Sequence, residues 1–598
     1  MVINDAAVRC YSVRSYPQHA PLWNMSELIG DSFQPAMQIQ APFLLTLGVH
    51  VPRQDEVRRV AKLKGARATQ NADSQMARYM PSFTVEKQDW DVMCKALDDG
   101  HSGVKLYHNL ITFAPLSQAN FTEHAVKALY SSKGWELQND VGVQLQSLLA
   151  ALPLTLSKRF AHELGIFGRL TSKTSRNAAN MMPVVGEWLG TGSPTLMLLG
   201  RKGQIQFLDI FEKAGQGGNY NVAIAARSGS GKSVLLNEIA FSYRGTDNGR
   251  GPGRVWIIDV GRSFERTCKL AGGQFIEFTE AAKLCLNPFT YLDDSHKVAF
   301  DEQINELKPI IAQMATPSRR TDDLENAWIE EAIHAAWEAK GNQATITTVA
   351  EWLQRHEHPR AKELGMMLYP YTREGVHGRF FEGQANLEFE NDFIVLELEE
   401  LKGKTDLQAV VLQTVMARIN QAIYLGREDG RRKLLMIDEA WDLFGVSENA
   451  AKFIETAARR IRKYGGSLLT ATQGINDYYA TPAAQAAFEN SDWMLLLAQK
   501  KASIEQLERS GRIPMDAHMK RALASITTVD GQYAEVMVLG PQGYSIGRLV
   551  LDPYTSLLYS TTNEDFIRIR ELERQRGIST AEALDVLLQE RRGRSHDA

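Results

Sequence analysis

Residues 223–240 read AIAARSGSGKSVLLNEIA and contain the residue types that hold phosphate groups. The end of this segment, Gly231-Lys232-Ser233, satisfies the last part of the P-loop pattern, which is Gly, four residues of any type, and Gly-Lys-Ser/Thr. Ala226 stands where the pattern has its first glycine. An alanine serves there if its φ is negative, so we expect the substitution to be tolerated.

The chemistry of such a loop comes from its backbone N–H groups, which surround phosphate oxygens at the start of a helix. Lys232 would reach the β and γ oxygens of ATP, and the Ser233 hydroxyl would be a ligand of Mg²⁺. YNVAIAA predicts a strand before the loop and residues from 232 onward predict a helix, which favours a P-loop over a chance Gly-Ser-Gly-Lys-Ser. The predicted nucleotide-binding residues are Arg227, Ser228, Gly229, Ser230, Gly231, Lys232, Ser233 and Val234.

An acidic pair, Asp438 and Glu439, ends the apolar run KLLMIDE. In ATPases, the first carboxylate of such a pair holds Mg²⁺ through water and the second polarises the attacking water. We therefore predict Asp438 as a metal-binding residue and Glu439 as a catalytic one. Taken alone, the pair is equally consistent with a solvated strand end.

Gln473 follows the next apolar run, GSLLTAT. The ends of parallel strands meet at one crevice in a doubly wound sheet. Gln473 would there sense the γ-phosphate or orient water, whereas the alternative is a polar residue that begins a loop. The two preceding motifs favour the functional interpretation.

Residues 458–464, ARRIRKY, form a basic cluster between these two strands. Three interpretations stay open: an exposed basic helix face, a nucleic-acid contact, and an arginine finger that completes the site of a neighbouring subunit. Most of the side chains are expected to belong to an exposed face. The candidates for the role in trans are Arg459 and Arg462.

The elements that position these residues indicate an α/β fold. Buried strands are predicted at RVWIIDV, DFIVLEL, KLLMIDE, GSLLTAT and WMLLLA, and their continuous apolar character is typical of a parallel sheet covered on both faces. Between them, residues 291–377 carry helical spacing alone, with a capping box predicted at Thr348 to Glu351. The expected fold class is a RecA-like P-loop ATPase domain with an all-helical insertion, preceded by an α+β N-terminal domain.

Boundaries follow from changes in this pattern. We expect an α+β domain at 1–185, with strands in 42–51 and 107–115, and a connecting segment at 186–220 that is rich in Gly, Ser and Thr. The P-loop core is predicted at 221–290 and 378–562, the insertion at 291–377, and a charged helical tail at 563–598.

Bulk properties exclude several classes of protein. The chain has 598 residues and a net charge of -4, so it lacks the overall basic charge of a dedicated nucleic-acid binder. No apolar run is long enough to span a membrane and no secretory signal begins the chain, so we expect a cytosolic protein whose membrane contacts pass through partners. The four cysteines form no C-x-x-C pair and are expected to be free thiols.

The order AxxxxGKS, IIDVGRSF, LNPF, VLELEELKG, LLMIDEAWDLF, RRIRKYGG and TATQG resembles the conjugative-transfer ATPases of type IV secretion systems, in particular the TraC type of F-like systems. Upstream, PLWNMSELIGDSFQ, ARATQNADSQMARYMP and LLAALPLTL are similar to the same family. The resemblance covers most of the chain. Family members usually have more sequence before the first of these segments, so an N-terminally shortened form or a fragment is expected.

The resemblance implies a cytoplasmic ATPase that is peripherally associated with the inner membrane and powers pilus assembly and transfer of DNA and protein. Its implied cofactors are ATP and Mg²⁺, bound by Lys232 and Ser233, with Asp438 and Glu439 as the second acidic motif and Gln473 as sensor. The implied partners are further copies of the chain in a hexamer, inner-membrane channel components, and pilin or pilus assembly factors.

Two other functions fit the same core. A DNA-pumping hexamer would line its channel with basic residues, and the acidic net charge and missing membrane spans weigh against it. An ATP-binding scaffold with little turnover would not need Lys232, Asp438, Glu439 and Gln473 together.

Overall fold

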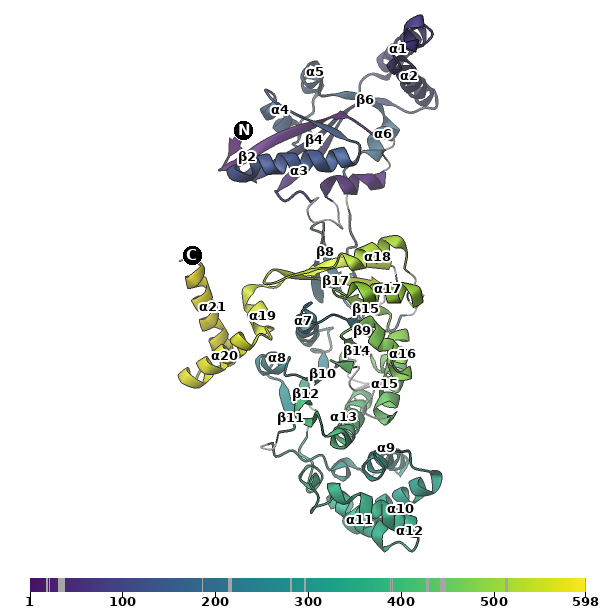
Figure 1. The fold of residues 1–598 in the computed structure, drawn as a ribbon, viewed down its shortest axis with the longest axis vertical. Coiled ribbons are helices and arrows are strands. Elements are labelled where there is room, and N and C mark those ends of the chain that lie inside the picture. Colours follow the sequence, from purple (N-terminus) through teal and green to yellow (C-terminus); the bar gives the residue numbers. More distant parts are fainter. Residues whose placement is uncertain are drawn as a thin grey trace. The chain divides into compact units, whose positions relative to one another are not determined.

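The computed structural model divides the chain into two compact units, Met1–Glu187 and Trp188–Ala598, each of which is described by itself (Figure 1). The structure describes residues 1–596 apart from 18–19, 21, 31–37, 185, 213–217, 280–281, 295–296, 388, 390, 426–429, 441–447, 511–512, 514 and 542.

The first unit is built on an antiparallel sheet. Among the described residues its six strands are ordered β1-β2-β4-β3, with β5 on β2 and β6 on β4. Side chains of β2, β4 and helix α3 form its core, including Tyr11, Leu110, Val126 and Tyr130. The strands are β1 (Val2–Ile3), β2 (Ala6–Ser15), β3 (Phe43–His50), β4 (Gly103–Pro115), β5 (Glu136–Asn139) and β6 (Thr171–Thr174).

Helices of the first unit flank this sheet. They are α1 (Gln54–Ala72), α2 (Ser82–Asp98), α3 (Ala119–Ser132), α4 (Gln144–Ala150), α5 (Lys158–Ile166) and α6 (Ser175–Asn180). The strands predicted in 42–51 and 107–115 are β3 and β4, so both predictions are confirmed.

The second unit contains a twelve-stranded sheet whose order is β11-β12-β10-β13-β14-β9-β15-β17-β18-β7-β8, with β16 on β17. The strands from β11 to β15 in this order are parallel, and β17, β18, β7 and β8 are antiparallel. The parallel strands are β9 (Val222–Ala225), β10 (Arg254–Asp259), β11 (Gln274–Glu277), β12 (Phe393–Glu397), β13 (Lys433–Ile437), β14 (Gly466–Thr472) and β15 (Trp493–Leu496). All five buried strands predicted from the sequence are present.

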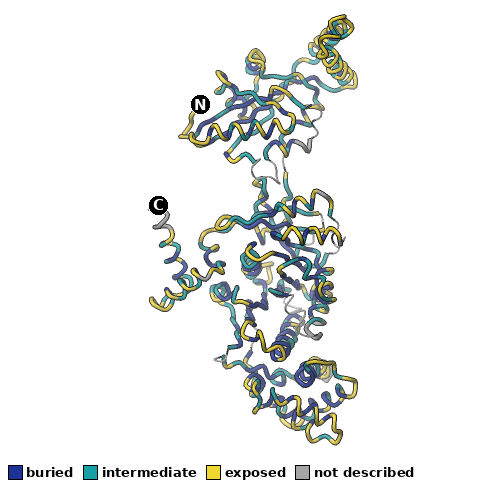
Figure 2. The backbone as a smooth tube through the Cα atoms, viewed as in Figure 1, coloured by how far each residue is buried: buried dark blue, intermediate teal, exposed yellow. Residues whose placement is uncertain are grey.

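Helices cover both faces of the parallel strands (Figure 1). Trp256 and Ile258 of β10 belong to the apolar core shared with α13 (Thr405–Leu425) and α15 (Glu448–Arg460). Val255 and Ile257 of the same strand belong to the core shared with α7 (Lys232–Gly245) and α8 (Glu265–Leu270). Because successive strand residues point to opposite faces, a strand buried on both faces is apolar throughout, and Figure 2 shows these strands as buried.

The predicted connecting segment is wrong for residues 196–208. They form β7 (Leu196–Gly200) and β8 (Ile205–Leu208), an antiparallel pair at the end of the sheet. Each strand has only four or five residues, too few to show a strand pattern of hydrophobicity among the surrounding Gly and Ser residues. The sheet also continues through β16 (Thr528–Val529), β17 (Tyr533–Gly540) and β18 (Gly543–Leu549), which the expectation of a parallel sheet did not include.

The segment between β11 and β12 is helical in its described part. It contains α9 (Lys297–Ala315), α10 (Asp323–Lys340), α11 (Ile346–Arg355) and α12 (Pro359–Met367). The capping box predicted at Thr348 is wrong, because Thr345 caps α11 and Thr348 is the third residue of that helix. Two threonines three residues apart make the box, and the sequence alone did not indicate which begins the helix.

The described residues of the second unit also form α16 (Pro482–Glu489), α17 (Lys501–Ser510), α18 (Ala517–Ala524), α19 (Pro553–Leu558), α20 (Asn563–Arg576) and α21 (Thr580–His596). The last three pack near α7 and α8, where Tyr559 donates to Glu238 at 3.0 Å and Arg570 pairs with Glu265 at 3.2 Å. In the described part of the chain, no helix is both long and apolar enough to cross a bilayer. All four cysteines are free, as predicted.

Candidate nucleotide site

The loop between β9 and α7 has the backbone that a phosphate cradle requires. Ala226 is buried, its N–H donates to the Thr472 carbonyl at 3.1 Å, and its φ is not positive. The positive φ values fall on Gly229 (75°) and Gly231 (91°), which lack the Cβ that makes this region costly. The alanine therefore occupies a position that needs no glycine, as the sequence predicts.

Two residues from the antiparallel part of the sheet support this loop. Thr528 donates to the Ser230 carbonyl at 3.0 Å, and the Ser230 hydroxyl donates to the Arg227 carbonyl at 2.6 Å. A Cβ added at Gly231 would lie 2.8 Å from the Cβ of Ala534. The loop is thus held from β16 and β17, a contact that no sequence motif indicates.

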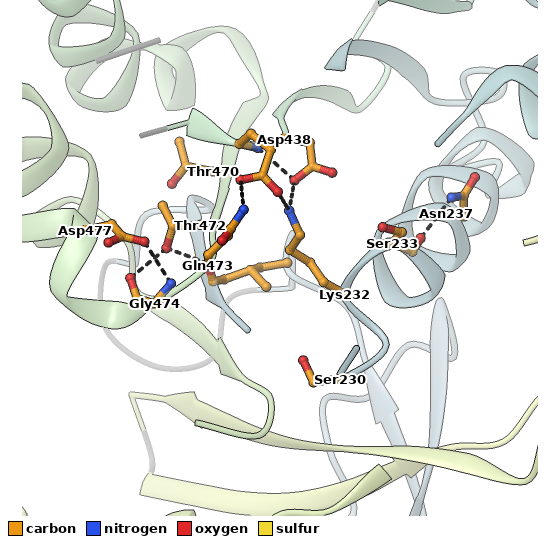
Figure 3. Close-up of polar contacts among 12 residues, drawn as sticks. Ser230, Lys232, Ser233, Asn237, Asp438, Thr470, Thr472, Gln473, Gly474 and Asp477 are labelled. Carbon is orange, nitrogen blue, oxygen red and sulfur yellow. Dashed lines mark hydrogen bonds and ion pairs between the residues drawn. The ribbon is translucent and has the colours of Figure 1, made fainter. Parts of the chain in front are cut away.

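Lys232 begins α7 and its ammonium lies between the two predicted carboxylates (Figure 3). Its Nζ donates to Asp438 Oδ1 and to Glu439 Oε1, both at 2.5 Å. Burial acts to lower the pKa of Lys232, but the two carboxylates raise it above its ordinary value. Burial raises the pKa of Asp438, an effect that its contacts with Lys232 oppose. The P-loop and the acidic pair, remote in sequence, therefore form one charged cluster.

The geometry after β13 directs both carboxylates to this cluster. Glu439 has φ +49°, a conformation that is uncommon for a residue with a side chain and that is concentrated at functional sites. The Glu439 N–H donates to Asp438 Oδ1 at 2.8 Å, which fixes one carboxylate against the other. Residues 441–444, the end of the LLMIDEAWDLF motif, lie outside the described part of the chain.

Gln473 lies at the carboxyl end of β14 and joins the same cluster. Its side-chain amide donates to Glu439 Oε2 at 3.3 Å, and the side chain is exposed. The turn that follows is held by Asp477, which accepts from the Gly474 N–H at 2.8 Å, and by Thr472, which donates to the Gly474 carbonyl at 3.0 Å. Asp477 was not predicted, although an acidic residue three positions after the residue that begins a helical turn is a known capping signal.

The first turn of α7 offers oxygen ligands of the kind that Mg²⁺ takes in proteins. Among the described residues the Ser233 hydroxyl has no hydrogen-bond partner, while the Ser233 carbonyl accepts from Asn237 at 2.8 Å. Together with the Asp438 carboxylate, this hydroxyl fits a magnesium ion bound beside phosphates. The Val234 side chain packs against the apolar cores, so only its backbone would face a nucleotide.

The structure does not bring Arg459 and Arg462 to this cluster within one chain. Arg459 lies in the last turn of α15, where it is exposed and pairs with Glu455 at 2.8 Å. Arg462 belongs to the short helix Ile461–Tyr464 that precedes β14. Gln473 follows the opposite end of that strand, which spans about 20 Å at seven residues.

Two further carboxylates end neighbouring strands and were missed. Asp259 ends β10 and Glu397 ends β12, and the two are paired in register. Asp259 is fully buried, and burial together with Glu397 and Asp438 raises its pKa well above the ordinary value. Glu397 accepts from the N–H groups of Gly261 and Arg262. The signal was present, because WIID before residue 260 repeats the pattern of LMID before Glu439.

Comparison with known proteins identifies two families. Residues 1–156 match the family described as TraC protein, and residues 197–591 match the TraG P-loop domain. TraC of Escherichia coli K12 is 28% identical over 604 residues, which covers 97% of this chain and 67% of that protein. VirB4 of Bartonella henselae is 22% identical over 429 residues, covering 69% of this chain and 50% of that protein.

Among solved structures, VirB4 of Thermoanaerobacter pseudethanolicus superposes with a TM-score of 0.50 at 22% identity. The match covers 62% of this chain and all of that one. The expected fold class, a RecA-like P-loop domain after an α+β N-terminal domain, is confirmed. The chain spans about two thirds of the length of Escherichia coli TraC and half that of Bartonella VirB4.

Proposed function

Because this chain belongs to the TraG P-loop domain family and is a P-loop ATPase of the type IV secretion class, we propose that it hydrolyses ATP to power pilus assembly and transfer of DNA and protein. The observation that carries the proposal is one cluster: Lys232 at the start of α7 meets Asp438, Glu439 and Gln473, which follow the adjoining strands β13 and β14.

Binding of ATP would redistribute the charges of this cluster. Lys232 would exchange its two carboxylates for phosphate oxygens, and the N–H groups of residues 227–234 would surround the β-phosphate. Ser233 and Asp438 would hold Mg²⁺, which neutralises negative charge that develops on the phosphates.

Release of Lys232 would leave Glu439 available as the base. Its carboxylate would accept a proton from the attacking water as the bond between the β- and γ-phosphates breaks. Gln473, which donates to Glu439 at 3.3 Å, would orient that water. The strained backbone of Glu439 keeps its carboxylate beside Asp438, so base and metal ligand act at one place.

We further infer that the working form is a homo-oligomer, with a hexamer as the expected state. Arg459 or Arg462 of one copy would meet the transition-state charge in the site of the next, since neither lies at the site of its own chain. Nucleic acid is not indicated as a partner by the net charge of -4.

The remaining parts would connect this motor to its surroundings. Residues 1–185 would dock on inner-membrane channel components, which would hold the chain at the cytoplasmic side of that membrane. Residues 291–377 and 563–598 would transmit motion of the core at 221–290 and 378–562 to pilin or pilus assembly factors.

The test measures steady-state ATP hydrolysis against protein concentration for the wild type and for Glu439→Gln, with bound nucleotide quantified in both. We expect turnover per chain to rise with concentration, and the variant to bind ATP without hydrolysing it. Turnover that is independent of protein concentration would contradict a site completed by a neighbouring copy. Turnover by Glu439→Gln would contradict the assignment of Glu439 as the base.

A mixing experiment separates the arginine from the carboxylate. Arg462→Ala and Arg459→Ala are each mixed with Glu439→Gln, and Arg460→Ala, a neighbour that is also exposed, is the matched control. A residue that acts in trans should restore part of the turnover in the mixture, because some interfaces then combine an intact Glu439 with an intact arginine.

A further inference from the structure

Helices α1 and α2 form an antiparallel hairpin that projects from the sheet of the first unit (Figure 1). Arg58 near the start of α1 donates to the Leu97 carbonyl near the end of α2, at 3.3 Å. A Cβ added at Gly65 would lie 3.5 Å from Cys94 Sγ, so the helices approach closely. The base is fixed because the Gln54 amide bonds both backbone groups of Gly103 in β4, at 2.8 and 3.1 Å.

This packing uses only one side of α1. Its buried residues are Ala61 and Ala68, which face α2. The opposite side, here called the outer face, presents Arg59, Leu63 and Arg67, with Lys62 at its edge, close enough for its charge to act on Cys94 of α2; all four residues are exposed. These residues lie three and four positions apart and therefore share one surface of the helix. The acidic residues of α1, Asp55 and Glu56, are confined to its first turn.

The outer face combines positive charge with apolar surface. Leu63 is 66% exposed and lies between basic residues on both sides. In the part of the chain that the structure describes, no carboxylate lies within ion-pair distance of Arg59, Lys62 or Arg67. Their charge is therefore available to an anionic partner.

The tip of the hairpin adds large, exposed apolar and aromatic side chains. Met76, Tyr79 and Met80 lie in the connection between α1 and α2, and Tyr79 is 87% exposed. Exposed apolar residues on a projection are costly in water and suit insertion into the boundary between lipid headgroups and acyl chains. Tyrosine is itself enriched at that boundary.

The exposed side of α2 differs in charge. Val85 and Val92 are as exposed there as the residues of α1, but Asp89 lies between them on the same side. Lys95, also exposed, lies three positions after Val92, so this side carries no net charge. An anionic surface would attract the outer face of α1 more strongly than this side, so the charges favour one orientation for the hairpin.

We propose that the outer face of α1 and the tip of the hairpin bind directly to an anionic lipid surface. The hairpin is a convex projection, which a deformable bilayer surface can receive without a matching groove. Basic residues supply attraction to headgroups, and Leu63, Met76, Tyr79 and Met80 supply shallow insertion. The inference concerns the first unit alone and does not depend on ATP hydrolysis or on oligomer formation.

The test is flotation of the full chain with vesicles of phosphatidylcholine, with and without phosphatidylglycerol. We expect binding only when phosphatidylglycerol is present, and weaker binding as salt increases, because screening weakens attraction between exposed charges. Arg59→Gln/Lys62→Gln/Arg67→Gln should reduce the vesicle affinity about a hundredfold, at about fivefold for each basic residue. Leu63→Ser/Tyr79→Ser should also reduce it, with the salt dependence kept.

Val85→Ser/Val92→Ser is the matched control, because it removes similarly exposed apolar surface from the side of the same hairpin that lacks net positive charge. It should bind as the wild type does, and thermal unfolding by circular dichroism should show that all variants remain folded. Wild-type protein that binds neither vesicle, or both equally, would overturn the proposal, and binding to neither would favour an acidic protein as the partner of this face. Equal loss in the control variant would overturn the assigned orientation.

Discussion

Lys232 forms ion pairs with both Asp438 and Glu439, so the charge of each of these three side chains is balanced by the others. All three groups are largely removed from solvent, and removing one partner of a buried pair leaves a charge without compensation. The Glu439→Gln experiment is informative because it keeps the shape and one hydrogen-bond acceptor of the side chain while it removes the base.

A substitution of Gln473, which follows β14, tests whether the end of that strand takes part in hydrolysis. Gln473→Ala should lower the turnover number about 10- to 100-fold with little change in ATP affinity, because the side chain would orient water rather than hold the nucleotide. Asn476→Ala, in the same turn region, is the control and should leave turnover unchanged. Equal loss of affinity and turnover would indicate a nucleotide ligand instead.

Two small residues of the P-loop should respond in opposite ways. Ala226→Gly should change ATP affinity by less than about twofold, because the position does not require a positive φ. Gly231→Ala should weaken ATP binding strongly, because φ there is 91° and the new Cβ would approach Ala534 at 2.8 Å. Isothermal titration with a nonhydrolysable ATP analogue measures both. Normal binding by Gly231→Ala would show that the loop rearranges at low cost.

At the scale of elements, α10 of the helical insertion depends on one carboxylate. Glu325 accepts from Arg319 at 2.7 Å on each oxygen, pairs with Arg360 at 2.9 Å, and completes the capping box with Asp322. The Arg319 hydrogen bonds are the main cause that lowers the pKa of Glu325 from 4.5 to about 2.

This pKa predicts acid sensitivity of the insertion. A carboxyl with a lowered folded-state pKa stabilises the fold above its unfolded pKa, and that contribution is lost as the pH falls from 4.5 towards about 2. The protection factors of residues 323–340, which compare exchange with the intrinsic rate at each pH, should therefore fall over this range. Glu325→Gln should exchange faster already at neutral pH and show a smaller change on acidification. Asp323→Asn, in the same turn but exposed, is the control and should behave as the wild type.

At the scale of the molecule, the two units have separate hydrophobic cores. A unit with its own core and hydrogen-bonded sheet is expected to fold alone. Residues 1–187 and 188–598, produced separately, should each unfold cooperatively, and the second should bind ATP with the affinity of the full chain. Calorimetry and nucleotide titration measure this. Loss of ATP binding in 188–598 would mean that the first unit supports the site.

The sequence alone determined the parts of this protein that depend on neighbouring residues. Buried strands were predictable because a strand covered on both faces is apolar at every position, and the P-loop was predictable because its N–H groups come from consecutive residues. The meeting of Lys232 with Asp438 followed from the rule that parallel strands end at one edge. The sequence also predicted that the P-loop tolerates Ala226, because alanine can replace glycine wherever φ is negative.

Tertiary structure decided what depends on pairing between distant segments. Strands β7 and β8 are too short to show a pattern, and β17 joins β15 through hydrogen bonds that no local signal encodes. For the same reason the support of the loop by Thr528 and Ala534, some 300 residues from Ser230, was not predictable. The outer face of α1 became visible only when packing with α2 had determined which side of the helix is buried, because exposure is a property of the folded chain.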